Sequence, residues 1–452
     1  MAEVDPNPQW AEMRRLPRKL FRKLGALRDA QIMSEWVKEH GGENDRVRAI
    51  LTEHFSSHEP ELLSEAQRAA EKFDEKRWKR LDRKLQKRLR LVPPGSQAAE
   101  CLAVERLEEA RDLHVRAVRE QKPEAWHELR IGIKKFRYTV ECLLPMRYAE
   151  WSGVLKQLQD TLGEIHDLDV LSALLREKTE NEASDQHDEW QRKIERERDN
   201  CLDQYSEIAT GRANLWNSWA EALPSGKRAQ ASALARIRVT ARAAGSQPRR
   251  AAQIHRIATA IFHACGRARV TPLFREPAAG RLLRAAGRLS GVRAKGGAIS
   301  PKELCRFLQR QPTPPGWTRE EWETLCGAVR YQRGPEPKLK ARAFAELTEQ
   351  QQQTVLAIAG LLRLARGLRR CGVQGGPGFQ ADRSAERVQI EVPGLLDSVE
   401  NAARLAVAKH LLEGYLALPV NLKSVTAPIA EMPGRKGPAV ISPSSTLAAA
   451  SD

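Results

Sequence analysis

The sequence predicts an all-α protein: a bundle of long helices, a second mainly helical domain and a disordered C-terminal tail. Helix-forming residues dominate the 452-residue chain. Alternating β-branched residues, which indicate strands, are nearly absent. Prolines and glycines gather at a few points, which indicate breaks between helices. The only strand that the pattern predicts lies at residues 388–392, with the sequence VQIEV.

These breaks divide the chain into two helical domains and a tail. They lie at Pro93-Pro94-Gly95, at Pro224-Ser225-Gly226, at Gly375-Gly376-Pro377-Gly378 and after Lys423. We therefore expect one helical domain over residues 10–222 and another over 230–423. The segment 424–452 is rich in Pro, Ser and Ala, and we expect it to be disordered.

Composition narrows the class of protein. The net charge is +17: residues 1–224 hold 39 Lys+Arg and 42 Asp+Glu, whereas residues 225–452 hold 36 and 16. The second half therefore carries the long-range attraction for polyanions. No stretch of eighteen apolar residues and no signal peptide is visible, so we expect a cytoplasmic protein without a membrane partner. The seven cysteines form no CxxC pair, so neither disulfides nor a metal or other cofactor are predicted.

Residues 127–141, HELRIGIKKFRYTVE, are the most informative segment. At about 100° per residue, their side chains separate into two faces of one helix. The apolar face, which we expect to pack against a core, holds Leu129, Gly132, Ile133, Phe136, Val140 and Leu143. The opposite face holds His127, Arg130, Lys134, Arg137, Tyr138 and Glu141.

The polar face presents cations over about 20 Å of the helix axis. Glu141 is the only acid among them, so pairs four residues apart do not neutralise the bases. Such a row suits a long, regularly charged ligand, which indicates a phosphate polymer. A basic face that only contacts solvent is about equally frequent for this pattern.

A nine-residue pattern occurs twice, as LGALRDAQI at 24–32 and as LGEIHDLDV at 162–170. The shared Leu-Gly and the matching Asp29 and Asp167 favour an internal duplication over chance. We interpret the two aspartates as groups that orient nearby Arg or Lys side chains or cap a helix. The charged helical segments predicted after the two copies are 61–91 and 186–208.

Together these features resemble the CHAD domain, a helical domain named for its histidines. The resemblance is carried by HELRIGIKKFRYTVE, by LKQLQDTLGEIHDLDVL at 155–171 and by LFRKLGALRDAQIM at 20–33. It implies a helical bundle over residues 10–222 with a basic central groove that binds inorganic polyphosphate. The groove residues that it implies are His127, Arg130, Lys134, Lys135, Arg137 and Tyr138, joined by Arg28 and Lys23 from the first half.

The first half departs from the family pattern because it lacks its own His-x-x-Arg helix. Either the natural start lies upstream of Met1, or this copy is degenerate and binds more weakly. A second basic stretch at 72–90 forms either another groove wall or a solvated helix face. Its bases on one face are Arg77, Arg80, Lys84, Lys87 and Arg88.

Residues 250–372 resemble the C-terminal HD-type domain of the exopolyphosphatase and guanosine pentaphosphatase family. The similar segments are QIHRIATAIF at 253–262, RLLRAAGRLSGV at 281–292, AVRYQRGPEP at 328–337 and AIAGLLRLARGL at 357–368. Domains of this type hold a metal through His and Asp. Here Leu289-Ser290, Gln332 and Arg366 stand at the expected ligand positions, and only His255 remains. The resemblance therefore implies a degenerate scaffold without catalytic residues.

Arginines near the lost ligands suggest a second anion site. Guanidinium groups in place of carboxylates would convert a metal cleft into an anion cleft. A merely basic surface is the alternative. The candidate residues are Arg284, Arg288, Arg363 and Arg366.

The sequence thus predicts a non-enzymatic protein that binds inorganic polyphosphate, with polyphosphate granules as one expected location. One alternative is a metal-dependent polyphosphatase or nucleotide phosphohydrolase, although no phosphate-loop glycine motif supports it. The other is non-specific RNA or DNA binding, for which an aromatic content of 5% is low. The sequence leaves the oligomeric state open.

Overall fold

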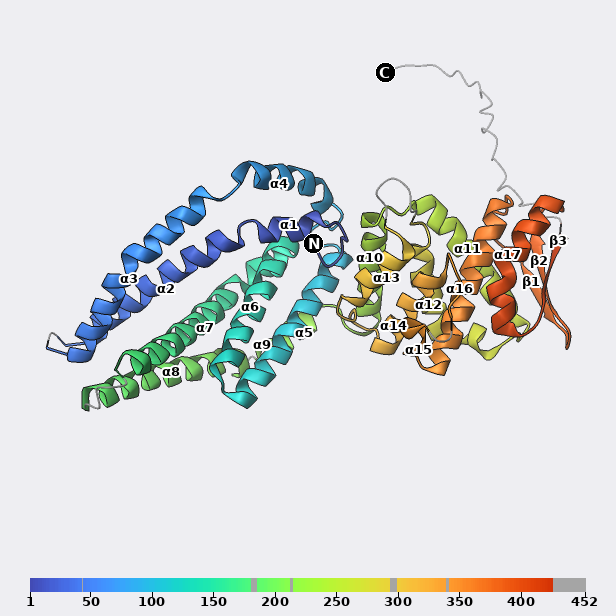
Figure 1. Ribbon diagram of the computed structural model, residues 1–452. Coiled ribbons are helices and arrows are strands. Elements are labelled where there is room, and N and C mark those ends of the chain that lie inside the picture. Colours follow the sequence, from blue (N-terminus) through green and yellow to red (C-terminus); the bar gives the residue numbers. More distant parts are fainter. Residues whose placement is uncertain (43, 180–184, 212–213, 293–298, 339–340, 426–452) are drawn as a thin grey trace, which may run out of the picture.

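The computed structural model describes residues 1–42, 44–179, 185–211, 214–292, 299–338 and 341–425. These residues confirm the mainly helical fold with its long helices (Figure 1). The elements are α1 (Gln9–Arg15), α2 (Arg18–His40), α3 (Arg46–Glu71), α4 (Glu75–Leu89), α5 (Gln97–Glu120), α6 (Pro123–Leu143), α7 (Pro145–Thr179), α8 (Asp185–Thr210), α9 (Leu215–Ala222), α10 (Gly226–Ala243), α11 (Pro248–Arg267), η1 (Pro272–Arg275), α12 (Pro277–Leu289), α13 (Pro301–Gln309), α14 (Arg319–Tyr331), α15 (Arg342–Ala345), α16 (Glu349–Arg370), β1 (Gln380–Arg383), β2 (Val388–Pro393), α17 (Val399–Leu416) and β3 (Val420–Val425). None of the described helices combines the length and apolar character that a membrane span needs.

Two long helical hairpins dominate the N-terminal half (Figure 1). Helix α2 packs along α3, and α7 packs along α8. The two copies of the nine-residue pattern lie in α2 and α7, so the hairpins occupy equivalent places in the duplication. The segment 61–91, predicted as one charged helix after the first copy, instead spans the end of α3 and all of α4. The break arises because Asp74 caps a new helix, accepting a hydrogen bond from the Arg77 amide.

Helix α6 lies between α5 and α7. It begins at Pro123, which suits the first helical position because proline has no amide hydrogen to leave unpaired. Its predicted apolar face is buried, with Leu143 half-buried at the end. At Gly132, a Cβ atom would lie 2.7 Å from a methyl group of Leu113. This glycine therefore lets α5 and α6 approach closely.

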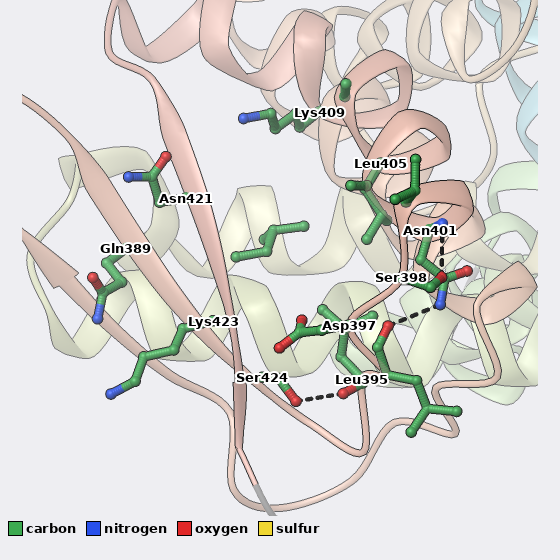
Figure 2. Close-up of a pocket in the computed structure, with 15 residues that line it drawn as sticks. Gln389, Leu395, Asp397, Ser398, Asn401, Leu405, Lys409, Asn421, Lys423 and Ser424 are labelled. Carbon is green, nitrogen blue, oxygen red and sulfur yellow. Dashed lines mark hydrogen bonds between the residues drawn. The ribbon is translucent and has the colours of Figure 1, made fainter.

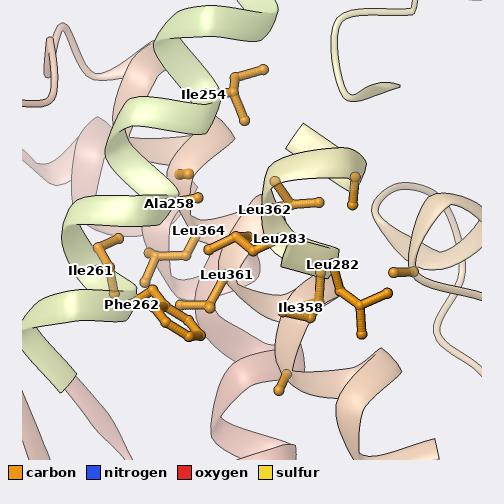
Figure 3. Packing of buried hydrophobic residues seen from close by; sticks show 14 of the residues in the cluster. Ile254, Ala258, Ile261, Phe262, Leu282, Leu283, Ile358, Leu361, Leu362 and Leu364 are labelled. Carbon is orange, nitrogen blue, oxygen red and sulfur yellow. The ribbon is translucent and has the colours of Figure 1, made fainter. Parts of the chain in front are cut away.

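The C-terminal half packs α11, α12, α14 and α16 around a second core. Ile254 and Ile261 of α11, Leu283 of α12 and Leu361 of α16 are among its buried side chains (Figure 3). A three-stranded sheet, β1-β2-β3, lies beside it, with β1 antiparallel and β3 parallel to β2. Helix α17 connects β2 to β3, as parallel strands require a crossover.

Strand β2 confirms the strand predicted at 388–392, whereas β1 and β3 were not predicted. Strand β1 has the polar sequence QADR, so it carries no apolar alternation. Strand β3 continues to Val425, so the segment 424–452 does not begin as an irregular tail. The rest of that segment, 426–452, lies outside the described residues.

The two halves meet where α10 packs on α5. Arg236 of α10 forms a buried ion pair with Glu105 of α5. Burial raises the pKa of Glu105 to about 7, although Arg236 acts in the opposite direction. Arg88 of α4 bridges the halves a second time, pairing with Asp5 and donating to the Ala243 carbonyl. The contact between the two halves is therefore polar as well as apolar.

Candidate functional site

The polar face of α6 lies beside α7, and charged side chains of α2 are close enough to act on it. We call its basic residues and their neighbours the α6 cluster. Its members are Arg28 of α2, His127, Arg130, Lys134 and Arg137 of α6, and His166 of α7. The side chains from α6 and α7 are half-buried, whereas Arg28 is exposed. The structure thus brings five of the predicted residues together and adds His166.

Arg130 lies over Gly163 of the second nine-residue copy, where a Cβ atom would be 3.9 Å from its Nε atom. That Nε is buried and has no hydrogen-bond partner among the described residues. At Gly25, the equivalent glycine of the first copy, the space within 4 Å is open. In the described residues the first half therefore places no arginine over its glycine, which agrees with the absent His-x-x-Arg helix.

Lys134 lies in a strongly positive environment. Its pKa is lowered chiefly by burial, and then by the charges of Arg130, Arg28 and Arg137. Asp29 partly offsets this effect. Across the described ranges, Lys134 forms no ion pair. An anion with several negative charges would bind favourably beside this amine, because it would neutralise the neighbouring guanidiniums as well.

Two histidines meet at the start of the α6 cluster. The Nδ1 atoms of His127 and His166 lie 3.3 Å apart, and the ring centroids are 4.5 Å apart. Burial, followed by the proximity of His127, lowers the pKa of His166. One ring can donate to the other only while the acceptor nitrogen is unprotonated.

Asp29 and Asp167, the aspartates shared by the two nine-residue copies, lie beside the α6 cluster. Burial, and then the nearby carboxylate of Asp29, raises the pKa of Asp167 to about 6. Arg130 and Arg28 act in the opposite direction. Both aspartates lie in helix interiors, so the capping alternative is wrong, whereas the alternative that they orient nearby bases stays a prediction. Their carboxylates lie near the bases of the α6 cluster.

Arg137 is held in position at the other end of the cluster. It donates a 2.8 Å hydrogen bond to Oε1 of Gln159 on α7. A hydrogen bond with Tyr148 raises the pKa of the guanidinium. Its charged carbon lies 5.9 Å from the ring centre of Tyr138, which is half exposed. These contacts fix the orientation of the guanidinium, while its buried Nε has no partner in the described part of the chain.

Two predicted residues point elsewhere. Lys135 forms a 2.8 Å ion pair with Glu109 of α5, on the flank of α6 away from α7. Lys23 pairs with Glu65 of α3. Both amines are neutralised locally, so the structure does not place them in the α6 cluster.

The second basic stretch forms α4, whose Leu81 and Leu85 are buried. Arg77 pairs with Glu12, and Arg88 pairs with Asp5. Arg88 and four further bases of α4 line a hollow of about 750 Å³, together with Asn7 and Gln9. The residues of α4 in this hollow are Arg80, Arg83, Lys84, Lys87 and Arg88.

The four arginines predicted as a second anion site divide into two pairs. Arg363 donates to the carbonyls of Tyr331, Gly334 and Pro335. Arg366 is buried and donates to the Ser290 carbonyl and to Oε1 of Gln332. Both therefore bind parts of the chain to one another, although Nε and Nη1 of Arg366 have no partner among the described residues.

Arg284 and Arg288, the second pair, lie on the outer face of α12. Arg284 is exposed and Arg288 is half-buried. Neither forms an ion pair in the described ranges. These two guanidiniums therefore remain candidates for binding an external anion.

Three of the positions named in the HD comparison, Ser290, Gln332 and Arg366, lie together. Arg366 contacts both Ser290 and Gln332. His255 packs against Gly287, whose Cβ would lie 2.7 Å from the histidine Nδ1. Among the described residues, no group of three or more His, Cys, Asp or Glu side chains could hold a metal ion.

A further hollow, of about 790 Å³, lies between α17 and the sheet (Figure 2). Leu405 and Lys409 line it from α17, and Asn421 and Lys423 line it from β3. Ser424 donates to the Leu395 carbonyl at its edge. None of the predicted site residues lies there.

His166 and Gln159 are the members of the site that sequence reasoning did not select. Both belong to the segment 155–171 that carries the resemblance. His166 lies directly before Asp167, so its place in the repeated pattern was a usable signal. Nothing in the sequence marks Gln159, because its role depends on the crossing of α6 and α7.

Comparison with known families supports the assignment of the N-terminal region. Residues 1–176 match the family model of the CHAD domain. The matched region ends near the C-terminus of α7, so α8 and α9, which we expected within this domain, lie beyond it. No curated protein matches the chain.

Proposed function

We propose that the N-terminal helical region binds inorganic polyphosphate through the α6 cluster. The single observation that carries the proposal is the set of fixed bases on one face of α6, two of which have buried Nε donors without partners. The CHAD domain is associated with polyphosphate, and the match over residues 1–176 supports the same ligand here.

The spacing of the bases suits a linear polyanion. His127 and Tyr138 are eleven residues apart, which corresponds to about 17 Å along a helix. A polyphosphate chain carries one negative charge on each phosphate, so several units can contact the row at once. Arg130 and Lys134 provide the central contacts. Hydrogen bonds with Gln159 and Tyr148 fix the orientation of the Arg137 guanidinium.

Equilibrium binding of long-chain polyphosphate to the full chain tests the proposal. Arg130→Ala with Lys134→Ala should weaken binding at least tenfold, because two charge-assisted contacts are lost. The matched control, Lys38→Ala with Arg119→Ala, removes the same charge from two exposed sites. Equal affinity of the two double variants would show that the cluster is not the binding site.

We also propose that the protein does not hydrolyse its ligand. The support is the convergence of Ser290, Gln332 and Arg366 where the resemblance expects metal ligands. Incubation of polyphosphate or guanosine polyphosphates with Mg²⁺, Mn²⁺ or Zn²⁺ should release no phosphate. Release that scales with protein and disappears in His255→Ala would establish the enzymatic alternative.

The nucleic-acid alternative is tested by competition. Long-chain polyphosphate should displace RNA or DNA from the protein at physiological salt, because the cluster offers no exposed aromatic row for bases. Displacement in the opposite direction would favour the nucleic-acid function. Binding of polyphosphate would also place the protein on cytoplasmic polyphosphate granules, which fluorescence microscopy can examine.

A further inference from the structure

A second line of cations occupies the outer face of α12. Arg281, Arg284 and Arg288 are spaced three and four residues apart, so they lie on one side of the helix. The other side is held firmly, since Leu282 and Leu283 point into the core that α12 shares with α11 and α16 (Figure 3). We call these three arginines the α12 strip. It extends for about 10 Å.

At its C-terminal end, the strip meets an imidazole of α11 and a guanidinium of α10. His255 of α11 packs on Gly287, between Arg284 and Arg288 in the sequence of α12. Burial and then the charges of these arginines lower the pKa of His255 to about 4. Burial, followed by the charges of Arg238 of α10 and Arg284, also lowers the pKa of Arg288. Helices α10 and α12 thus bring like charges together, beside the uncharged imidazole of His255.

At its N-terminal end, the strip borders a hollow of about 630 Å³ between α11, η1 and α12. Arg281 and Arg284 line this hollow, facing His263, Arg267 and Arg275. Arg281 pairs with Glu321, and Arg267 donates to the Phe379 carbonyl. Glu276 is the only carboxylate among the lining residues. Arg284 therefore contributes both to the hollow and to the cluster around His255.

The like charges of this arrangement repel one another, and a bound anion would offset that repulsion. Arg238, Arg284 and Arg288 form no ion pair within the described ranges, so their mutual repulsion is not relieved by the protein itself. A compact ligand with several negative charges could contact two or three guanidiniums at once.

We infer that the α12 strip and its hollow bind an oligophosphate, a short chain of two to four phosphoryl groups. The length of the strip suits such a chain better than a nucleic-acid strand. The aromatic residues of the hollow, Phe262 and Phe274, are buried and offer no stacking surface. This site is separate from the α6 cluster and does not depend on its function.

Calorimetry with tripolyphosphate tests this inference on the full chain. The starting protein carries Arg130→Ala with Lys134→Ala, so that the α6 cluster does not contribute. This protein should still bind one tripolyphosphate. Adding Arg284→Ala and Arg288→Ala should weaken that binding about tenfold or more. ATP presents three phosphoryl groups on a nucleoside. Its affinity should fall by the same factor in the strip variant if the site recognises phosphoryl groups.

The matched control adds Arg319→Ala and Arg342→Ala instead, which removes two exposed arginines from the same half. The control should bind tripolyphosphate like the starting protein. The strip variant should melt at the same temperature as the starting protein or higher, because like charges are removed. Arg284→Gln with Arg288→Gln keeps the side-chain stems and serves as a second variant.

Three results would overturn the inference. The first is an equal loss of tripolyphosphate affinity in the strip and control variants. The second is that the starting protein does not bind tripolyphosphate. The third is that the starting protein binds single-stranded RNA through the strip but does not bind tripolyphosphate. Because these variants differ only in the C-terminal half, the outcome does not depend on whether the α6 cluster binds long-chain polyphosphate.

Discussion

The α6 cluster and the arginines of the C-terminal half differ in how their charges are used. The N-terminal region is nearly neutral overall, yet it collects bases on one face of α6 and leaves buried donors of Arg130 and Arg137 without partners. The C-terminal half carries the excess of positive charge, yet Arg363 and Arg366 donate to backbone carbonyls. Arg366 also has buried Nε and Nη1 donors without partners among the described residues, but its side chain is enclosed by the protein. Net charge therefore attracts polyanions, whereas a site requires fixed cations that a ligand can reach.

The same distinction separates the two pairs of arginines in the C-terminal half. Arg363 and Arg366 lie where carbonyls at helix ends and in the following loop need donors, so they act as structural residues. Arg284 and Arg288 lie on the outer face of a helix and have like-charged neighbours. Removing the first pair should cost stability, and removing the second should cost binding.

The largest effect is expected for the apolar face of α6. Phe136 is fully buried, and its ring centre lies 5.2 Å from that of Trp219. Phe136→Ala should lower the free energy of unfolding by about 3–5 kcal/mol, because it leaves a cavity in a packed core. Denaturant titration measures this change. A similar loss for Arg130→Ala with Lys134→Ala would show that the two faces of α6 are not separable.

Salt should affect binding at the α6 cluster almost as strongly. If the cluster neutralises about four phosphates, raising monovalent salt from about 50 to 200 mM should weaken long-chain polyphosphate binding about fifty- to a hundredfold. Counterion release from the polymer causes this dependence. A flat salt profile, or no binding at low salt, would contradict the electrostatic mechanism. The Arg130→Ala, Lys134→Ala protein should give a shallower slope.

Substitution of Arg363 should have a smaller effect, which is on the free energy of unfolding. Arg363→Ala leaves the carbonyls of Tyr331, Gly334 and Pro335 without their side-chain donor. We expect a loss of about 2 kcal/mol in stability, measured by denaturant titration, because hydrogen bonds from charged groups are lost. Tripolyphosphate affinity should stay unchanged. Arg284→Ala is the control with the reverse pattern: it should weaken tripolyphosphate binding without lowering the free energy of unfolding.

The features of the fold that could be predicted are those with a strong local period. The sequence of α6 separates apolar from basic side chains at helical spacing, and the structure places them on a buried and a half-buried face. The strand β2 was predicted because VQIEV alternates. Strand β1 was not, since its polar residues pair with β2 through the backbone alone.

The site could be predicted only as far as one helix determines it. Residues at the edge of the polar face can turn to either neighbouring helix, and Lys135 turns to Glu109 of α5. Arg366 was expected to bind an external anion because its sequence position does not show that the Ser290 carbonyl lies within reach. Both depend on helix crossings, which the spacing along one helix does not determine.

The smallest expected effect is the pH dependence of polyphosphate binding. The pKa of Asp167 is raised to about 6, and that of His166 is lowered from its usual value. Lowering the pH from about 7.5 to 5.5 removes most of the negative charge of Asp167 and begins to add positive charge at His166. Both changes favour a polyanion, so binding should tighten about fivefold, the effect of one unit charge near the ligand.

Asp167→Asn isolates the aspartate from the histidines. This variant should bind more tightly at pH 7.5 and lose much of the pH dependence. It should also fold normally, because a carboxyl group whose pKa is raised by folding contributes stability at low pH that is lost as the pH rises through about 6. Asp160→Asn, at an exposed position of the same helix, is the control. If both variants keep the wild-type pH profile, Asp167 does not lie beside the bound phosphates, and the α6 cluster has to be placed farther from α7.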